Sequence, residues 1–328
     1  MLALSKADVR QLAPMPVAIE LMKTAFAELS AGRTVSPLRT VIPVPDHHGD
    51  ALFMPAFVPA ANALGLKVVS VFMNNRARGL PAIHALVCLV DTETGQPLAI
   101  IDGTYLTALR TGAVSGAATD LLARPESRVL VTIGSGAQGV TQSAAVCAVR
   151  PIERIVAVDI DNAALDRMRD TIEREWPDLL GRLETTTDAS VVREADVICT
   201  ATTSRTPVFD AALVRPGTHI NAVGAYTPEM QELPAAIVQR ATVVLDSIDA
   251  ALAEAGDLII PLEAGLVNRL KFDRELGTVA SGAAPGRTSA DEITLFKSVG
   301  NAVQDVVVAR RVYDQAVATG AGVTFDLG

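Results

Sequence analysis

The sequence has few cysteines, few aromatic residues and no long apolar run. Its 328 residues include three cysteines, one tryptophan and 4% aromatic residues. An odd number of cysteines without regular spacing excludes the disulfide framework of small secreted proteins. Cys88, Cys147 and Cys199 each lie inside an apolar segment, so we expect buried thiols in a reducing compartment. No apolar stretch approaches the ~18 residues that cross a bilayer, and the first ten residues lack a signal-peptide pattern. We therefore expect a cytoplasmic protein that binds no membrane.

Basic charge is also scarce, which argues against a nucleic-acid-binding protein. The 28 lysines and arginines are outnumbered by 37 aspartates and glutamates, for a formal net charge of −9, and such a chain is poorly suited to bind phosphate backbones. The excess acid lies outside residues 1–120, which carry nine side chains of each sign. A small anionic substrate is therefore expected to bind the N-terminal part, whose cations include Arg39, Lys67, Arg76, Arg78 and Arg110.

Motifs of metal sites and hydrolases are missing. The sequence contains no His-Glu-x-x-His, paired Cys-x-x-Cys or EF-hand pattern and no nucleophile elbow, so neither a metal site nor hydrolase chemistry is expected. His47 and His48 lie in a polar loop and are expected to face solvent. His84 and His219 lie in apolar segments and are expected to be core residues.

The chain does contain enough apolar material for two packed domains, with 49% hydrophobic and 20% charged residues. Apolar spacing predicts an amphipathic helix over residues 14–30 that ends before Gly32, and residues 85–102 predict a β-hairpin with a glycine turn. From residue 128, short apolar strands alternate with helices, which indicates a parallel sheet covered on both faces. The expected strands are residues 128–134, 154–160, 195–202, 218–224 and 241–247.

The predicted fold class is therefore α/β. A Rossmann-type doubly wound parallel sheet is expected over residues 119–296, inserted into a second α+β domain formed by residues 1–118 and 297–328. A long helix is expected from Ser289, because Ser289 and Glu292 match the S-x-x-E capping box. This helix would lead the chain back into the outer domain.

A glycine loop is the strongest local motif. Gly134, Gly136 and Gly139 have the spacing G-x-G-x-x-G, after a predicted strand and at the start of a predicted helix. Gly134 would permit the tight turn, Gly136 the approach of a pyrophosphate, and Gly139 close packing of helix on strand. Asp159 follows the next strand, where an acid is expected to bind the ribose hydroxyls. The sequence therefore predicts a dinucleotide site.

Asp159 also bears on the choice of dinucleotide. A carboxylate accepts hydrogen bonds from the ribose and repels a 2′-phosphate, and Ile160 follows it where an arginine would favour the phosphate. We expect a preference for NAD(H), with NADP(H) possible. Asp161 could share or displace the role of Asp159.

Three cations are candidates for binding an anionic substrate. Lys67 lies in an apolar strand, where a charge is costly without a partner, Arg110 lies near the start of a helical pattern, and Arg39 lies in a loop. Gathered in one pocket, they would grip a carboxylate. Sequence spacing alone does not bring them together, and membership in separate structural ion pairs is the simpler interpretation.

Several segments together resemble the ornithine cyclodeaminase/mu-crystallin family over nearly the whole chain. They are residues 65–70, 102–119, 134–139, 254–258 and 291–305, of which RTGAVSGAAT and LFKSVG are the most specific. The resemblance implies a homodimer, with substrate binding and dimerisation by the outer domain and a catalytic cleft at the domain junction.

The resemblance also implies site residues. Arg39, Lys67 and Arg110 would grip the substrate carboxylate, with Val299 beside the substrate and Lys67 near the reacting nitrogen, which makes Lys67 and Arg110 the catalytic candidates. The implied cofactor contacts are Arg110, Thr111, Gly134, Gly136, Ala137, Gln138, Gly139, Asp159, Thr200 and Ser298.

Members of this family include cyclodeaminases, alanine dehydrogenases and reductases of cyclic ketimines. In the cyclodeaminases, the loop that corresponds to residues 224–229 carries an aspartate, and here Tyr226 stands in its place. Tyrosine, with a reference pKa of about 10, is a poor base near neutral pH, and Glu229 is expected at the surface.

We therefore expect a reductase that converts Δ1-pyrroline-2-carboxylate or Δ1-piperideine-2-carboxylate to proline or pipecolate by hydride transfer to the imine carbon. The alternatives are an ornithine cyclodeaminase, an alanine-type dehydrogenase and a non-catalytic, mu-crystallin-like protein that binds a dinucleotide.

Overall fold

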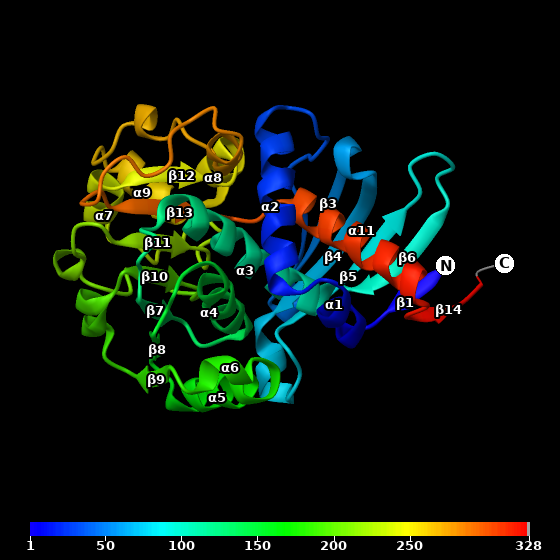
Figure 1. The fold of residues 1–328 in the computed structure, drawn as a ribbon, viewed down its shortest axis with the longest axis horizontal. Helices are drawn as coiled ribbons and strands as arrows, with labels where there is room; N and C mark the ends of the chain where they lie inside the picture. The colour runs from blue at the N-terminus through cyan, green and yellow to red at the C-terminus, as the bar shows by residue number, and fades with distance from the viewer. Residues whose placement is uncertain (327–328) are drawn as a thin grey trace. The chain divides into compact units, whose positions relative to one another are not determined.

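The computed structural model describes residues 1–326 apart from the side chain of Arg76. It divides into two compact units. Unit 1 is formed by Met1–Arg110 together with Asn301–Gly328, and unit 2 by Thr111–Gly300. The α/β fold class is confirmed, and Figure 1 shows the elements of each unit.

Unit 1 contains a mixed sheet whose described strands are ordered β14-β1-β6-β5-β4-β3-β2. The strands β2 to β6 form an antiparallel meander, and β1 joins β6 in parallel. The strands are β1 (Leu2–Leu4), β2 (Thr40–Val44), β3 (Gly49–Val58), β4 (Ala63–Phe72), β5 (Ile83–Val90), β6 (Pro97–Asp102) and β14 (Val323–Thr324).

Helices cover one face of this sheet. The helices are α1 (Lys6–Leu12), α2 (Met15–Ser30), α11 (Ala302–Thr319) and the start of α3 (Gly103–Leu122), with short 3-10 turns at Pro45–His47, Pro59–Ala61 and Met73–Arg78. The helix α11 lies across β3, β4 and β5 and packs on α2 (Figure 1). Alternate residues of β3, such as Leu52 and Met54, bury their side chains with Val303 and Val306 of α11.

Two local predictions are confirmed in unit 1. The helix predicted over residues 14–30 is α2, and Gly32 follows it with a φ of +68°. The predicted hairpin is formed by β5 and β6, with Gly95 at a φ of +75° in the turn. The side chain of Asp91 stabilises this turn by accepting hydrogen bonds from the Glu93 and Thr94 amides.

Unit 2 contains a parallel sheet whose described strands are ordered β12-β13-β11-β10-β7-β8-β9. This doubly wound order starts at the centre and reverses direction between β8 and β10, on either side of β7. The strands are β7 (Val129–Ile133), β8 (Arg154–Val158), β9 (Leu183–Thr186), β10 (Val197–Thr200), β11 (His219–Ala222), β12 (Thr242–Leu245) and β13 (Thr294–Lys297). The five strands predicted from residue 128 are all present.

Helices and short turns connect these strands. The helices are α4 (Ala137–Val149), α5 (Asn162–Glu175), α6 (Pro177–Leu180), α7 (Ala235–Arg240), α8 (Ile248–Glu254), α9 (Gly256–Glu263) and α10 (Leu276–Ala280), with 3-10 turns at Ala189–Glu194, Ala211–Leu213 and Arg269–Lys271. The core beside the sheet is built from its β-branched and leucine side chains together with Phe209 and Phe272.

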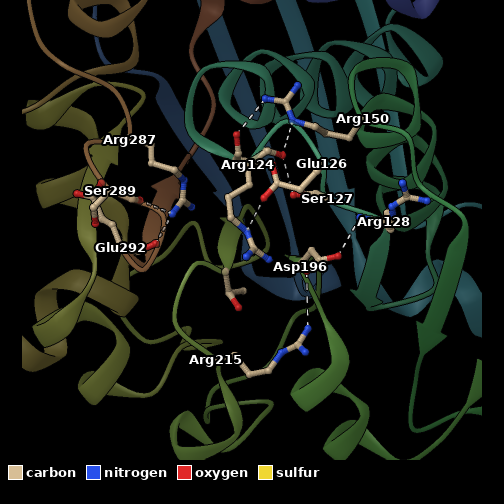
Figure 2. A network of polar contacts seen from close by, with 12 residues as sticks. Arg124, Glu126, Ser127, Arg128, Arg150, Asp196, Arg215, Arg287, Ser289 and Glu292 are labelled. Atoms are coloured by element: carbon tan, nitrogen blue, oxygen red, sulfur yellow. Dashed lines mark hydrogen bonds and ion pairs between the residues drawn. The ribbon is translucent and has the colours of Figure 1, made fainter.

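The helix predicted to begin at Ser289 is wrong. Residues 289–291 form a bend and turn, and Thr294–Lys297 form the fully buried strand β13, between β11 and β12. The Glu292 carboxylate accepts hydrogen bonds from the Thr288 amide and the Thr242 hydroxyl. Figure 2 shows Arg287 beside Glu292, to whose carbonyl it donates. The helix begins later, where Asn301 and Gln304 form the capping box of α11.

The arginine-rich network of Figure 2 secures the amino end of the parallel sheet. Asp196, just before β10, accepts hydrogen bonds from the Arg128 and Val129 amides at the start of β7 and from the Arg124 guanidinium. Arg150 donates to carbonyl groups near the end of α3, among them those of Thr119 and Ala123. These contacts hold structure together at the end of the sheet opposite the glycine loop.

The histidine predictions hold for three of the four residues. His47 and His48 are exposed, and His219 is buried, as expected. The prediction for His84 is wrong, because its side chain is exposed on β5, on the sheet face opposite α11.

The three cysteines are free thiols, but only Cys199 is fully buried. Cys88 and Cys147 are half-buried, so the expectation of three buried thiols is met only in part. Burial raises the pKa of Cys199 to about 12 and that of Cys147 to about 11, which keeps both protonated. In the described part of the chain, no helix is long and apolar enough to cross a membrane.

Candidate functional site

The glycine loop connects β7 to α4 in unit 2. Gly134 has a φ of +99°, and a Cβ there would lie 2.5 Å from the Ala201 carbonyl oxygen, so the turn requires glycine. A Cβ on Gly139 would lie 2.1 Å from the Gly134 carbonyl oxygen, because α4 packs closely on the loop. Gly136 has open space where a Cβ would stand, which lets a ligand approach its backbone.

The loop presents polar groups that suit an anion. Helix α4 starts at Ala137, and in the described structure no side chain caps it and no acid lies in its first turn. Its amide groups carry the positive end of the helix dipole. Ser135 Oγ and Gln138 Oε1 are buried and have no hydrogen-bond partner among the described residues. These groups, at the carboxyl end of β7 and next to the reversal of strand order, fit the diphosphate of a dinucleotide.

Asp159 lies directly after β8 and faces the glycine loop. Its Oδ2 accepts a hydrogen bond of 2.8 Å from the Ser135 amide, and its Oδ1 accepts one of 3.1 Å from the Asp161 amide. Asp161 caps α5 through Ala163 and pairs with Arg167. Asp161 is therefore engaged by its own helix, while the carboxylate of Asp159 adjoins the loop.

Thr200 is buried at the carboxyl end of β10, and its hydroxyl donates to the Glu232 carboxylate at 3.0 Å. Glu232 also accepts hydrogen bonds from the amides of Thr202, Gly224 and Ala225. One carboxylate thus ties the loop after β10 to the loop after β11. Burial and the neighbouring Asp257 carboxylate raise the pKa of Glu232.

A second buried carboxylate supports the first. Asp257 accepts hydrogen bonds from the amides of Glu232 and Leu233 and forms a 2.9 Å ion pair with Lys297 at the end of β13. Neither charge of this ion pair is exposed to solvent. The network therefore connects the carboxyl ends of β10, β11 and β13.

Asp246, at the end of β12, holds the loop that follows β13. Its Oδ2 accepts hydrogen bonds from the Ser298 hydroxyl at 2.7 Å, the Val299 amide at 2.9 Å and the Gly300 amide at 2.8 Å. Ser298 and Val299 are both buried. The remaining candidate in unit 2, Thr111, is also buried, and its carbonyl accepts a hydrogen bond from Gln142 of α4.

Unit 1 brings two of the three predicted cations onto one carboxylate. Lys67 faces α11 because alternate residues of β4 point to that side of the sheet. Its Nζ lies 2.7 Å from Oδ2 of Asp305, while Nε of Arg110 lies 3.1 Å from Oδ1 of the same residue. Arg110 also donates to the Gln304 side chain at 2.7 Å. All three charged side chains are at least nine-tenths buried.

The protonation of Lys67 is finely balanced. Burial, together with the positive charges of Arg110 and Arg39, lowers its pKa, while Asp305 raises it, and the result is a pKa of about 7. Arg39, half-buried in the loop before β2, is thus close enough to Lys67 to act on its charge. Arg78 is exposed, and the side chain of Arg76 lies outside the described residues.

The loop that follows β11 carries Tyr226 and Glu229. Tyr226 is half-buried and packs against the apolar core of unit 2, whereas Glu229 is exposed, as expected. A Cβ on Gly224 would lie 2.4 Å from Oε1 of Glu232, and a Cβ on Gly256 would lie 2.2 Å from the Met230 carbonyl. Close packing therefore fixes the path of this loop.

Sequence reasoning missed the buried acids. Asp305, Glu232, Asp257 and Asp246 each lie within or beside apolar segments, where a charge is costly without partners. The same argument that singled out Lys67 could have found Asp305 and Lys297. It could not have named their partners, which come from distant parts of the chain.

The chain is similar to known proteins over almost its whole length. A family model described as "Ornithine cyclodeaminase/mu-crystallin family" matches residues 1–320. A Δ1-pyrroline-2-carboxylate reductase of Bacillus cereus is 41% identical over 323 residues, which cover 98% of each chain.

Solved structures are also similar to this chain over almost its whole length. The Δ1-pyrroline-2-carboxylate reductase of Thermococcus litoralis, in complex with NADH and L-proline, has a TM-score of 0.94 and 39% identity, over 99% of this chain and 100% of that one. An archaeal alanine dehydrogenase dimer with bound NAD has a TM-score of 0.90 and 34% identity, over 100% and 99% of the two chains.

Proposed function

This chain belongs to the ornithine cyclodeaminase/mu-crystallin family, and from that premise we propose that it is an NAD(H)-dependent reductase of small cyclic ketimines. The substrate would be Δ1-pyrroline-2-carboxylate or Δ1-piperideine-2-carboxylate, and the product proline or pipecolate. The observation that carries the proposal is the convergence of Lys67 and Arg110 on Asp305, with Arg39 close by. Similarity to reductases named for this substrate supports it.

The charge of this cluster suits a carboxylate. Lys67 and Arg110 share the single carboxylate of Asp305, and the positive charge of Arg39 also acts on Lys67, so an anionic imino acid would meet a cationic environment. Arg110 is already held by Asp305 and Gln304, and a guanidinium held in place loses little freedom when it binds an anion. Arg39 and Arg110 would bind the carboxylate and so fix the orientation of the ring.

Lys67 would act at the ring nitrogen. With a pKa of about 7, it can hold or give up a proton near neutral pH. The protonated form would donate a hydrogen bond to the nitrogen side of the substrate, which makes the imine carbon more electrophilic. A carboxylate base is not required for this reaction, which is consistent with Tyr226 in place of an aspartate.

The glycine loop of unit 2 would bind the cofactor, through Gly134, Gly136, Ala137, Gln138 and Gly139, and Asp159 would bind the adenosine ribose. NADH bound there would supply the hydride for the imine carbon. Arg110, Thr111, Thr200 and Ser298 remain the other proposed cofactor contacts, and Val299 the proposed substrate contact. Asp159 favours NAD(H), and NADP(H) is the second choice.

We also propose that the protein is a cytoplasmic homodimer that functions in proline metabolism. The sheet face of unit 1 opposite α11 carries partly exposed apolar side chains, which supports a dimer interface. The family resemblance and the alanine dehydrogenase dimer support the same assembly. The three free thiols suit a reducing compartment.

Steady-state kinetics tests the proposed reaction. Addition of Δ1-pyrroline-2-carboxylate should oxidise NADH, seen as loss of absorbance of the reduced nicotinamide, and proline should accumulate. Lys67→Ala and Arg110→Ala should each lower kcat/KM by about a hundredfold or more, because each removes one charge from a buried network. NADH binding at the glycine loop should persist in the Lys67 variant.

Lys23→Ala and Arg33→Ala are matched controls, since both side chains form ion pairs at the surface of unit 1, and they should keep wild-type activity. Absence of turnover with both the five- and six-membered imines would refute the proposal. Release of ammonia from ornithine with catalytic NAD would assign the protein to the lyases instead.

A further inference from the structure

Asp305 is the acid at the centre of the cation cluster, and its contacts divide between two elements. It lies in the first turn of α11, where the helix dipole favours a negative charge. Its Oδ2 meets Lys67 of β4, and its Oδ1 meets Arg110 of α3. Its side chain is entirely buried. One carboxylate therefore fixes the distance between the two cations.

The neighbours of Asp305 fix its geometry from both sides. Gln304, the preceding residue, accepts a hydrogen bond from Arg110 and another from the Asn301 amide. Its Nε2 lies 3.4 Å from the Arg110 carbonyl oxygen. Arg110 thus contacts two consecutive side chains of α11, those of Gln304 and Asp305. Among the described residues, Lys67 has Asp305 as its one anionic partner.

Electrostatics makes this acid necessary for the charge of Lys67. The charged groups that act on Lys67 are Arg110 on α3, Arg39 in the loop before β2, and Asp305 on α11. Two of the three are positive and, like burial, they disfavour the protonated amine. Asp305 opposes all of these effects. Without the Asp305 charge, the pKa of Lys67 would therefore be lower.

We propose that Asp305 is a positioning residue for the reduction: it holds Lys67 and Arg110 in the arrangement that the imino acid meets, and its charge favours the protonated form of Lys67. This inference rests on the proposed function. It adds to that function the residue on which the two proposed catalytic side chains depend.

The test is the pH dependence of kcat/KM with Δ1-pyrroline-2-carboxylate and NADH. If protonated Lys67 is the active form, activity falls as the pH rises through its pKa. Asp305→Asn keeps the shape of the side chain and removes the charge, so the fall should move to lower pH by about one unit or more. The imine of the substrate titrates equally with every variant, so a difference between variants reports the enzyme.

Asp314→Asn is the matched control. Asp314 lies on the same helix, is half-exposed and pairs with Arg310, so this variant should keep the wild-type profile. Lys67→Arg gives a second check: an arginine stays charged throughout the range, so the remaining activity should keep only the pH dependence that comes from the substrate imine.

If the Asp305→Asn variant does not fold, Asp305→Glu tests whether Asp305 is a positioning residue. It keeps the charge but moves the carboxylate by one methylene, so kcat should fall by about tenfold or more while the pH of the descending limb stays near that of the wild type. An unchanged profile in Asp305→Asn, or wild-type kcat in Asp305→Glu, would overturn the inference. Failure of the wild-type enzyme with both imines would instead refute the proposed function.

Discussion

Asp159 has a visible role in the fold beside its proposed role in cofactor binding. It ties the loop after β8 to the glycine loop through the Ser135 amide. Ile160, the next residue, is almost fully exposed and therefore imposes no packing constraint on a substitution. The choice between the two nicotinamide dinucleotides should therefore depend on charge at these two positions.

Cofactor preference can be tested with the double variant Asp159→Asn with Ile160→Arg. Asparagine keeps an acceptor for the Ser135 amide and removes the charge that repels a 2′-phosphate, and the arginine can pair with that phosphate. The ratio of kcat/KM for NADPH to that for NADH should rise about tenfold or more. Ile160→Arg alone, which retains Asp159, should change the ratio much less. A double variant with the wild-type ratio would remove Asp159 from the cofactor site.

At the scale of elements, a buried polar chain attaches α3 to the parallel sheet. His219 of β11 is bonded through Nδ1 to the Thr294 hydroxyl of β13 and through Nε2 to the Asn221 side chain. Asn221 in turn donates to the Thr119 hydroxyl of α3. Burial lowers the pKa of His219 to about 3, and the nearby charges of Arg287 and Arg150 act in the same direction. The imidazole is therefore neutral in the folded protein.

This neutral histidine makes the fold sensitive to acid. The unfolded chain takes up a proton near the ordinary histidine pKa of about 6.5, whereas the folded chain does so only near 3, so stability is lost as the pH falls between these values. His219 can lower the free energy of unfolding by at most about 1.4 kcal/mol for each pH unit.

Urea unfolding at several pH values between about 7 and 4 measures the effect of His219. His219→Gln should be less stable than the wild type at neutral pH but should lose less stability on acidification. His84→Gln, at the exposed histidine of β5, should follow the wild type throughout. If the free energy of unfolding fell equally with pH in the His219 variant and the wild type, His219 would not be the source of the acid sensitivity.

At the scale of the whole molecule, the apolar sheet face of unit 1 is the feature that points to assembly. The helix-covered face takes the odd-numbered side chains of β4, β5 and β6, and the opposite face takes the even-numbered ones. Leu66, Val68, Leu86, Cys88 and Ile100 lie on this second face, side by side in the register of the strands, and are partly exposed. Apolar groups gathered in this way are typical of a protein interface.

Charge placed on this face should separate the proposed dimer. Leu86→Glu together with Ile100→Glu would bury unpaired carboxylates in the interface, and the mass from sedimentation equilibrium should drop from two chains to one. Val317→Glu is the control, because Val317 is an exposed apolar residue of α11, on the other side of the sheet. The proposal would be contradicted if the wild-type protein had the mass of a monomer, or if the double variant remained a dimer.

Much of the fold could be predicted from short stretches of sequence. Five strands of unit 2, the helix after the glycine loop, the hairpin of β5 and β6 and the loop itself were predictable, because each has a signal within a few residues, whereas β9 was not predicted and β13 was taken for part of a helix. Gly134 illustrates this: its place in the G-x-G-x-x-G spacing predicts the tight turn that its positive φ confirms. Periodicity, capping and turn chemistry act over such distances.

Only the tertiary structure determined the contacts between residues that are far apart in the sequence. The segment after Ser289 has a helical pattern, but burial between β11 and β12 made its apolar part a strand. Lys67 and Asp305 come from opposite ends of the chain, and no local signal pairs them. A charged residue within an apolar segment indicates that its side chain needs a partner, because burial without one is costly. The identity of that partner depends on long-range packing, because the two side chains meet and lose their water only when the chain folds.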